Sequence, residues 1–186
     1  DLYLLRVGGD RAIALTTDPA DDSRAAFSPD GERIAFRSER DGGGLFVMGA
    51  TGESVRRVTD AGFDPSWSPD GRRLVYATEE VFDPVSRDGN SELWIVEVDS
   101  GGKTLLFSGD AVQPAWSRQG DRIAYWANTQ GQRDLWTVAA AGGEPVAVTR
   151  DAATDWSPEW SPDGRWLHFA SDRGGSYNLW RVEIDP

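Results

Sequence analysis

One four-residue turn, repeated along the chain, most constrains the fold. Ser-Pro-Asp-Gly begins at Ser28, Ser68 and Ser161, and a degenerate copy, Ser-Arg-Gln-Gly, begins at Ser117. Proline presets φ at the first corner of such a turn, while Asp and Gly suit corners that need local hydrogen bonding or positive φ. An aromatic residue precedes each copy, and an alternating aliphatic-x-aromatic pattern follows it, as in a β-strand. Each copy is therefore predicted to join two antiparallel strands.

The spacing of the copies predicts the architecture. They lie roughly 40–50 residues apart, and repeats of about this length made of short strands are typical of β-propeller blades. A second strand pair follows each of the first three turns: residues 45–48 with 55–59, 93–98 with 105–108, and 135–138 with 146–149. Four strands per repeat predict an all-β propeller of four-stranded antiparallel blades, with about four blades in the chain.

The chain is out of phase with these blades. Residues 1–16 supply strands three and four of an incomplete blade, full blades are expected at 17–59, 60–108 and 109–149, and residues 150–186 form a blade without its fourth strand. An open propeller exposes sheet edges, which invite aggregation. The phase therefore predicts either a piece of a larger propeller or a half-ring whose homodimer is an eight-bladed ring, since two-fold dimers are the commonest homo-oligomers. A closed four-bladed monomer is the alternative.

Charge and composition exclude several classes of partner. The formal net charge is −12, from 19 basic and 31 acidic residues. Nucleic acids and anionic membrane surfaces attract basic proteins, so neither is expected to bind. No apolar run approaches the length of about 18 residues that spans a membrane. The chain has no cysteine, which leaves its redox compartment open.

The sequence lacks recognisable catalytic machinery. Its only histidine, His168, occupies a strand position where the other repeats carry Ala35, Val75 and Ala124, so it is predicted to be packed. There is no Gly-x-Ser-x-Gly elbow, phosphate-binding loop or kinase signature. A lone histidine without cysteine also disfavours a zinc site. These observations predict a protein that is not an enzyme and has no cofactor.

The repeat resembles a known family. Trp-Ser-Pro-Asp-Gly with its aliphatic-x-aromatic strand, followed by Ser38-Glu39-Arg40 or Ser171-Asp172-Arg173, is similar to the WD-like repeat of TolB-like β-propellers over essentially the whole chain. More narrowly, residues 142–181 resemble propellers of bacterial serine/threonine kinases and sensor proteins. The resemblance implies a bacterial, extracytoplasmic scaffold that binds protein or peptide partners near its central channel. A repeat motif transfers a fold more firmly than a function.

Candidate binding residues lie in the loops that enter the first strand of each blade. Propeller topology brings these loops to one face, around the mouth of the channel. Carboxylates there can bind a hard cation or steer a basic partner, and aromatic rings can anchor a ligand. The alternatives are turn capping for the acids and packing against the next blade for the aromatics. The predicted partner site comprises Asp22, Phe63, Asp64, Asp110, Asp155 and Trp156.

One long loop, residues 79–91, interrupts the repeat plan. Loops of this length in compact domains are often functional, although a tolerated insertion explains one equally well.

Three functional hypotheses follow. In the first, the propeller binds a protein or peptide at its acidic loop face. In the second, it is a fragment of a larger hydrolase, lyase, kinase-linked enzyme or sensor, in which it gates or senses a ligand. In the third, it is an excised or engineered propeller fragment that self-assembles.

Overall fold

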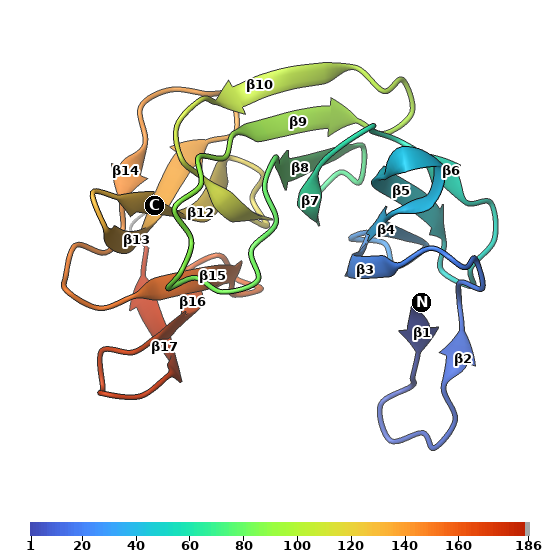
Figure 1. The fold of residues 1–186 in the computed structure, drawn as a ribbon, viewed down its shortest axis with the longest axis horizontal. Coiled ribbons are helices and arrows are strands. Elements are labelled where there is room, and N and C mark those ends of the chain that lie inside the picture. Colours follow the sequence, from blue (N-terminus) through green and yellow to red (C-terminus); the bar gives the residue numbers. More distant parts are fainter. Residues whose placement is uncertain (185–186) are drawn as a thin grey trace.

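A computed structural model of the chain describes residues 1–184. Antiparallel sheets stand side by side around an arc, with the N-terminal hairpin at one end and β17 at the other (Figure 1). Three of the sheets in this part of the chain have four strands, one has three, and the hairpin has two. The prediction of an all-β propeller with antiparallel blades is confirmed. The pairing of two copies into an eight-bladed ring stays a prediction.

The strands follow one another within each sheet. The hairpin consists of β1 (Tyr3–Leu4) and β2 (Ile13–Ala14). The first full sheet contains β3 (Asp22–Phe27), β4 (Arg33–Ser38), β5 (Gly44–Gly49) and β6 (Arg56–Arg57), with a short 3-10 turn, η1 (Arg40–Gly42), between β4 and β5. The second contains β7 (Phe63–Trp67), β8 (Arg73–Ala77), β9 (Leu93–Glu97) and β10 (Lys103–Phe107).

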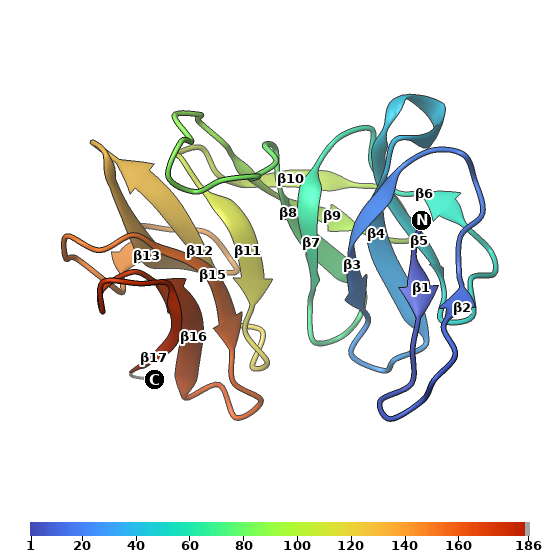
Figure 2. The same ribbon diagram turned by 60° about the horizontal axis from the view of Figure 1, so that its bottom comes forward.

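The remaining sheets repeat this order. The third contains β11 (Val112–Trp116), β12 (Arg122–Thr129), β13 (Gln132–Ala139) and β14 (Val146–Ala147). The last contains β15 (Asp155–Trp160), β16 (Trp166–Ser171) and β17 (Asn178–Glu183). In both ribbon views the first strands β3, β7, β11 and β15 line the inside of the arc (Figures 1 and 2).

The Ser-Pro-Asp-Gly turns close by side-chain hydrogen bonds. Ser28 Oγ accepts from the Arg33 amide at 2.9 Å, Asp30 Oδ1 accepts from the Glu32 amide at 3.0 Å, and Gly31 has φ of 75°. In the degenerate copy Asp121 replaces the missing aspartate, because Ser117 Oγ donates to its Oδ1 at 2.8 Å. The degenerate sequence therefore keeps the same turn with a carboxylate from a later position.

The core lies between neighbouring sheets and is built mainly from their second and third strands. Phe36, Leu45, Leu74, Leu93 and Leu135 are completely buried. His168, predicted to be packed, is only half-buried. Its sheet ends the arc and has a neighbouring sheet on one side only, among the described residues.

Two tryptophan side chains hydrogen-bond to the sheet before their own, whereas the Trp116 indole donates within its own turn, to the Gly120 carbonyl at 3.2 Å. Trp67 Nε1 donates to the Ala26 carbonyl at 3.0 Å, and Trp160 Nε1 donates to the Ala115 carbonyl at 3.0 Å. The Arg33 guanidinium lies 4.9 Å from the centre of the Trp67 ring, which adds a cation–π contact across the same boundary. Trp67 and Trp160 thus connect their blades to the preceding blade.

Replacing Trp67 by phenylalanine is expected to lower the free energy of unfolding by about 1–2 kcal/mol, since the change removes a buried hydrogen bond and part of a packed ring. Chemical denaturation measures the loss. Trp180, 38% exposed on β17, offers a matched control. Its replacement by phenylalanine is expected to cost less than about 0.5 kcal/mol. Equal losses for the two variants would contradict a role in joining the sheets.

Candidate functional site

Each first strand carries the same backbone irregularity. The pairing of β3, β7, β11 and β15 with the following strand shifts register near the middle of the strand, as at a β-bulge. One residue at each shift adopts the left-handed region, with φ between 50° and 55°. These residues are Arg24, Asp64, Gln113 and Ser157, hereafter the bulge ring. Bulges re-aim side chains, and left-handed non-glycine residues concentrate at functional sites.

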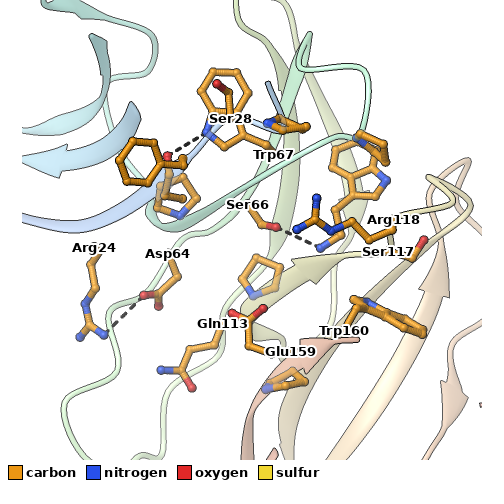
Figure 3. Close-up of a pocket in the computed structure, with 18 of the residues that line it drawn as sticks. Arg24, Ser28, Asp64, Ser66, Trp67, Gln113, Ser117, Arg118, Glu159 and Trp160 are labelled. Carbon is orange, nitrogen blue, oxygen red and sulfur yellow. Dashed lines mark hydrogen bonds and ion pairs between the residues drawn. The ribbon is translucent and has the colours of Figure 1, made fainter. Parts of the chain in front are cut away.

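The bulge ring lines a central cavity of about 620 Å³. Arg24, Asp64, Gln113, Glu159 and Arg118 lie around one space on the inside of the arc (Figure 3). Proline follows the ring residue in three of the four strands and also lines the cavity: Pro65, Pro114 and Pro158. The cavity therefore combines a rigid backbone with side chains that differ from strand to strand.

Two carboxylates that line the cavity have raised pKa values. Asp64 Oδ1 lies 3.5 Å from Arg24 Nη1, whereas its buried Oδ2 has no hydrogen-bond partner. Burial raises the pKa of Asp64 above its usual range, and the Arg24 charge only partly opposes this. Glu159 is an exposed residue of the cavity wall, and partial desolvation still raises its pKa, opposed by the charge of Arg118. A cationic group on a ligand would compensate the desolvation of Asp64 and would be attracted to the charge of Glu159.

Hydrogen bonds fix the opposite side of the bulge ring. Gln113 Oε1 accepts from Trp126 Nε1 at 2.7 Å and from Ser157 Oγ at 3.0 Å. Trp126 is completely buried, so its indole holds the Gln113 amide from within the core. The cavity wall is thus set before any ligand arrives.

Two of the predicted site residues are enclosed within their own sheets. The side chains of Asp22 and Asp155 are fully buried and pair at 2.7 Å with Arg40 and Arg173, respectively. Burial raises the pKa of Asp22, but hydrogen bonds from Ser38, Thr16 and Arg40 outweigh it and leave the pKa below its usual range. Both aspartates tie the start of a first strand to the end of the second strand of their sheet.

The other predicted residues are spread around the loop face. Asp110 binds the Arg87 guanidinium through both carboxylate oxygens. Phe63 lies under Arg37, with the guanidinium 4.6 Å from the ring centre, and Trp156 makes an edge contact with Tyr177 at 4.8 Å. Of the six predicted residues only Asp64 lines the central cavity.

Sequence reasoning missed Arg24, Gln113, Ser157 and Glu159, which complete the cavity. Their residue types share no chemistry. The left-handed conformation could not be read from the sequence, because four different residue types adopt it. One signal was present, because three of the four ring residues precede a proline by one position and a tryptophan by three. A proline inside a predicted strand points to a bulge or an edge.

Two other structural features bear on ligands and membranes. No group of three or more histidine, aspartate or glutamate side chains gathers as a potential metal-binding set within residues 1–184. The same part of the chain contains no helix long and apolar enough to cross a membrane.

Comparison with known proteins identifies relatives of two kinds. The chain is 26% identical over 166 residues to the uncharacterized protein Atu1656 of Agrobacterium fabrum, covering 86% of this chain and 54% of that protein. It is 30% identical over 179 residues to the uncharacterized peptidase YuxL of Bacillus subtilis, covering 92% of this chain and 24% of the peptidase. The chain thus spans about half the length of the first relative and a quarter of the second.

Solved structures give the same picture. A provisionally named TolB from Agrobacterium tumefaciens superposes with a TM-score of 0.81 at 25% identity, covering 98% of this chain and 69% of that one. An oligogalacturonate lyase in complex with manganese superposes with a TM-score of 0.73 at 20% identity, covering 99% of this chain and 56% of that one. The second likeness concerns the fold alone.

The expectation that the protein is not an enzyme was wrong. The relatives include a peptidase, a lyase shares the fold, and both proteins are longer than this chain. Catalytic motifs are missing from these 186 residues, but the longer proteins contain further chain in which a catalytic domain can lie. The TolB-like propeller fold therefore occurs in proteins named for enzymatic activity as well as in TolB proteins. Residues 1–84 and 63–186 each match the model of the TolB beta propeller domain, and the chain belongs to that family.

Proposed function

We propose that the chain binds a protein or peptide segment through the central cavity and the acidic loop face around it. The observation that carries the proposal is Asp64, which a strained backbone presents to the cavity with a buried oxygen left unpaired. Proteins retain such a cost where it supports function. The chemistry fits a segment that brings an ammonium or guanidinium group to Asp64 and Glu159.

In this proposal the six residues predicted from the sequence have different roles. Asp64 contacts the ligand directly. Phe63 and Trp156 are assigned to the rim, where their half-buried rings would add apolar surface. The remaining aspartates, Asp22, Asp110 and Asp155, hold the surrounding loops in place through their arginine partners.

A second candidate function is supported by the likeness to the peptidase and the lyase. In a longer protein the same cavity would select or admit substrate for a catalytic domain elsewhere in the chain. Peptide binding by the propeller is common to both functions. Family membership and the net charge of −12 favour an extracytoplasmic setting with a basic partner.

Selection of phage-displayed random dodecapeptides on the chain tests the proposal. Recovered sequences are expected to be enriched in lysine and arginine, and synthetic copies are expected to bind more tightly as pH rises. The sign follows from Asp64 and Glu159: their pKa values are raised, so deprotonation creates the charges that attract the cation only as pH climbs through those values. Titration calorimetry across the acidic range measures the change.

The variant Asp64→Asn is expected to lose most of this pH dependence and to bind cationic peptides about tenfold less tightly. Asparagine retains the size of the side chain and tolerates the left-handed backbone. Asp99→Asn is the matched control, because Asp99 lies 86% exposed beside Arg56. Recovery of no binding peptide, or equal binding by both variants, would overturn the proposal.

A further inference from the structure

The loop between β8 and β9, residues 79–91, is held down at its C-terminal part by a buried arginine. Arg87, with only 3% of its side chain exposed, donates to both carboxylate oxygens of Asp110 and to Glu79 Oε2 at 2.6 Å. Asn128 Nδ2 donates to the Arg87 carbonyl at 3.0 Å. The loop therefore belongs to the second sheet in sequence but is held in place by hydrogen bonds to the third sheet and to Asp110, which precedes it.

Two further arginines hold the middle of the loop. Arg133 of β13 donates to the carbonyls of Pro84 and Val85. From the other side, Arg24 of the bulge ring donates to the Val81 carbonyl at 2.8 Å and lies 3.4 Å from Glu80. The loop is therefore connected directly to the cavity wall. It reaches inward from the arc (Figure 1), at the end where β11 begins (Figure 2).

Between these fixed points the loop exposes apolar side chains. Phe82 is 86% exposed and Val85 is 48% exposed, while the adjacent Val81 is buried. An exposed aromatic ring on a loop that is already ordered can bind a partner without the entropy loss that a mobile loop would incur. Rigid aromatic anchors of this kind dominate the binding energy of protein interfaces.

The charges around these side chains favour one kind of partner. Glu80, Asp83 and Asp88 lie close to the apolar pair in the sequence, and Asp83 and Asp88 are exposed. The only cation within the loop, Arg87, is neutralised by Asp110 and Glu79. The arginines that contact the loop from outside, Arg24 and Arg133, donate to its backbone carbonyls. The exposed side chains of the loop itself are therefore apolar, acidic or neutral, and their complement is apolar and basic.

We propose that Phe82 and Val85 form a docking lip at the mouth of the central cavity, where they bind an apolar side chain of a basic peptide whose cationic group enters the cavity. The inference rests on the proposed function and names the class of its partner. It assigns the long loop to the binding site as a fixed element.

The test uses the dodecapeptides selected on the chain and compares three variants by fluorescence anisotropy. Phe82→Ala is expected to weaken binding of the basic, apolar-containing peptides about tenfold, whereas Phe82→Leu, which keeps an apolar anchor, is expected to retain most of the affinity. Val146→Ala is the matched control, because Val146 is 62% exposed on β14, away from the lip, and its replacement is expected to change nothing. Thermal denaturation checks that all variants fold.

Each outcome separates this inference from the proposed function. Weaker binding by Phe82→Ala, together with loss of binding when the peptide's apolar residue becomes serine, supports the lip. Peptides that lose affinity with Asp64→Asn but bind Phe82→Ala like the parent chain overturn the lip and leave the cavity proposal intact. Selection of no peptide overturns both.

Discussion

Replacing Trp126 by alanine is expected to lower the free energy of unfolding by about 3–5 kcal/mol, the range found for large aromatic residues removed from protein cores. Trp126 lies on β12 with no exposed surface. Its ring faces the Arg87 guanidinium at 5.4 Å, and its Nε1 holds the Gln113 amide at 2.7 Å. Its loss therefore leaves a cavity in the core and removes support from both the bulge ring and the lip.

Guanidinium denaturation with linear extrapolation measures the effect of Trp126→Ala. Trp126→Phe is expected to fall between the parent chain and the alanine variant, because it keeps most of the volume but loses the hydrogen bond. Trp180→Ala serves as the control for removal of a half-exposed indole. A loss of less than about 1 kcal/mol for Trp126→Ala would show that the core collapses around the missing ring. That result would contradict a rigid wall of the central cavity.

The second large effect is expected at Asp110. Its carboxylate accepts two hydrogen bonds from Arg87, and it also accepts from the Asn128 amide at 2.7 Å and the Ser91 amide at 3.1 Å. Asp110→Ala is expected to destabilise the fold by about 3–5 kcal/mol, since it leaves a buried guanidinium with incomplete compensation. Glu79 remains as a partner, which favours the lower part of this range.

A double-mutant cycle with Arg87→Met isolates the interaction between Arg87 and Asp110. The double variant is expected to be more stable than the sum of the two single losses predicts, because neither charge is left buried alone. Asp99→Ala breaks the exposed pair with Arg56 and is expected to cost at most about 1 kcal/mol. Additive losses at Asp110 and Arg87 would contradict a coupled, buried pair.

The fold was predictable because its signals are local. Ser28, Ser68 and Ser161 each begin a turn whose hydrogen bonds stay within six residues. Consecutive residues therefore determine the geometry of each turn. The tryptophans that contact the preceding sheet were predictable only as core residues. The carbonyl that Trp67 binds lies 41 residues away in the sequence, so the sequence pattern does not reveal this hydrogen bond.

The site was predicted less well because similar aspartates have different surroundings. Asp22, Asp64 and Asp155 all lie near the start of a first strand. Asp22 and Asp155 find an arginine 18 residues later, in a Ser-x-Arg segment that ends the second strand. Asp64 instead occupies the bulge position, which turns it inward. Topology predicted a shared face, but only the backbone register decides which carboxylates face the cavity.

In the bulge ring, the backbone conformation belongs to the fold, whereas the side chains are what a ligand contacts. Arg24, Asp64, Gln113 and Ser157 share a backbone conformation but differ in charge, length and hydrogen-bonding capacity. The hydrogen-bonded turns and the tryptophans that contact the preceding sheet lie outside the ring. Mutation can therefore exchange the chemistry at four convergent points while the scaffold stays the same. Such modularity gives one repeat architecture a route to new specificities in few evolutionary steps.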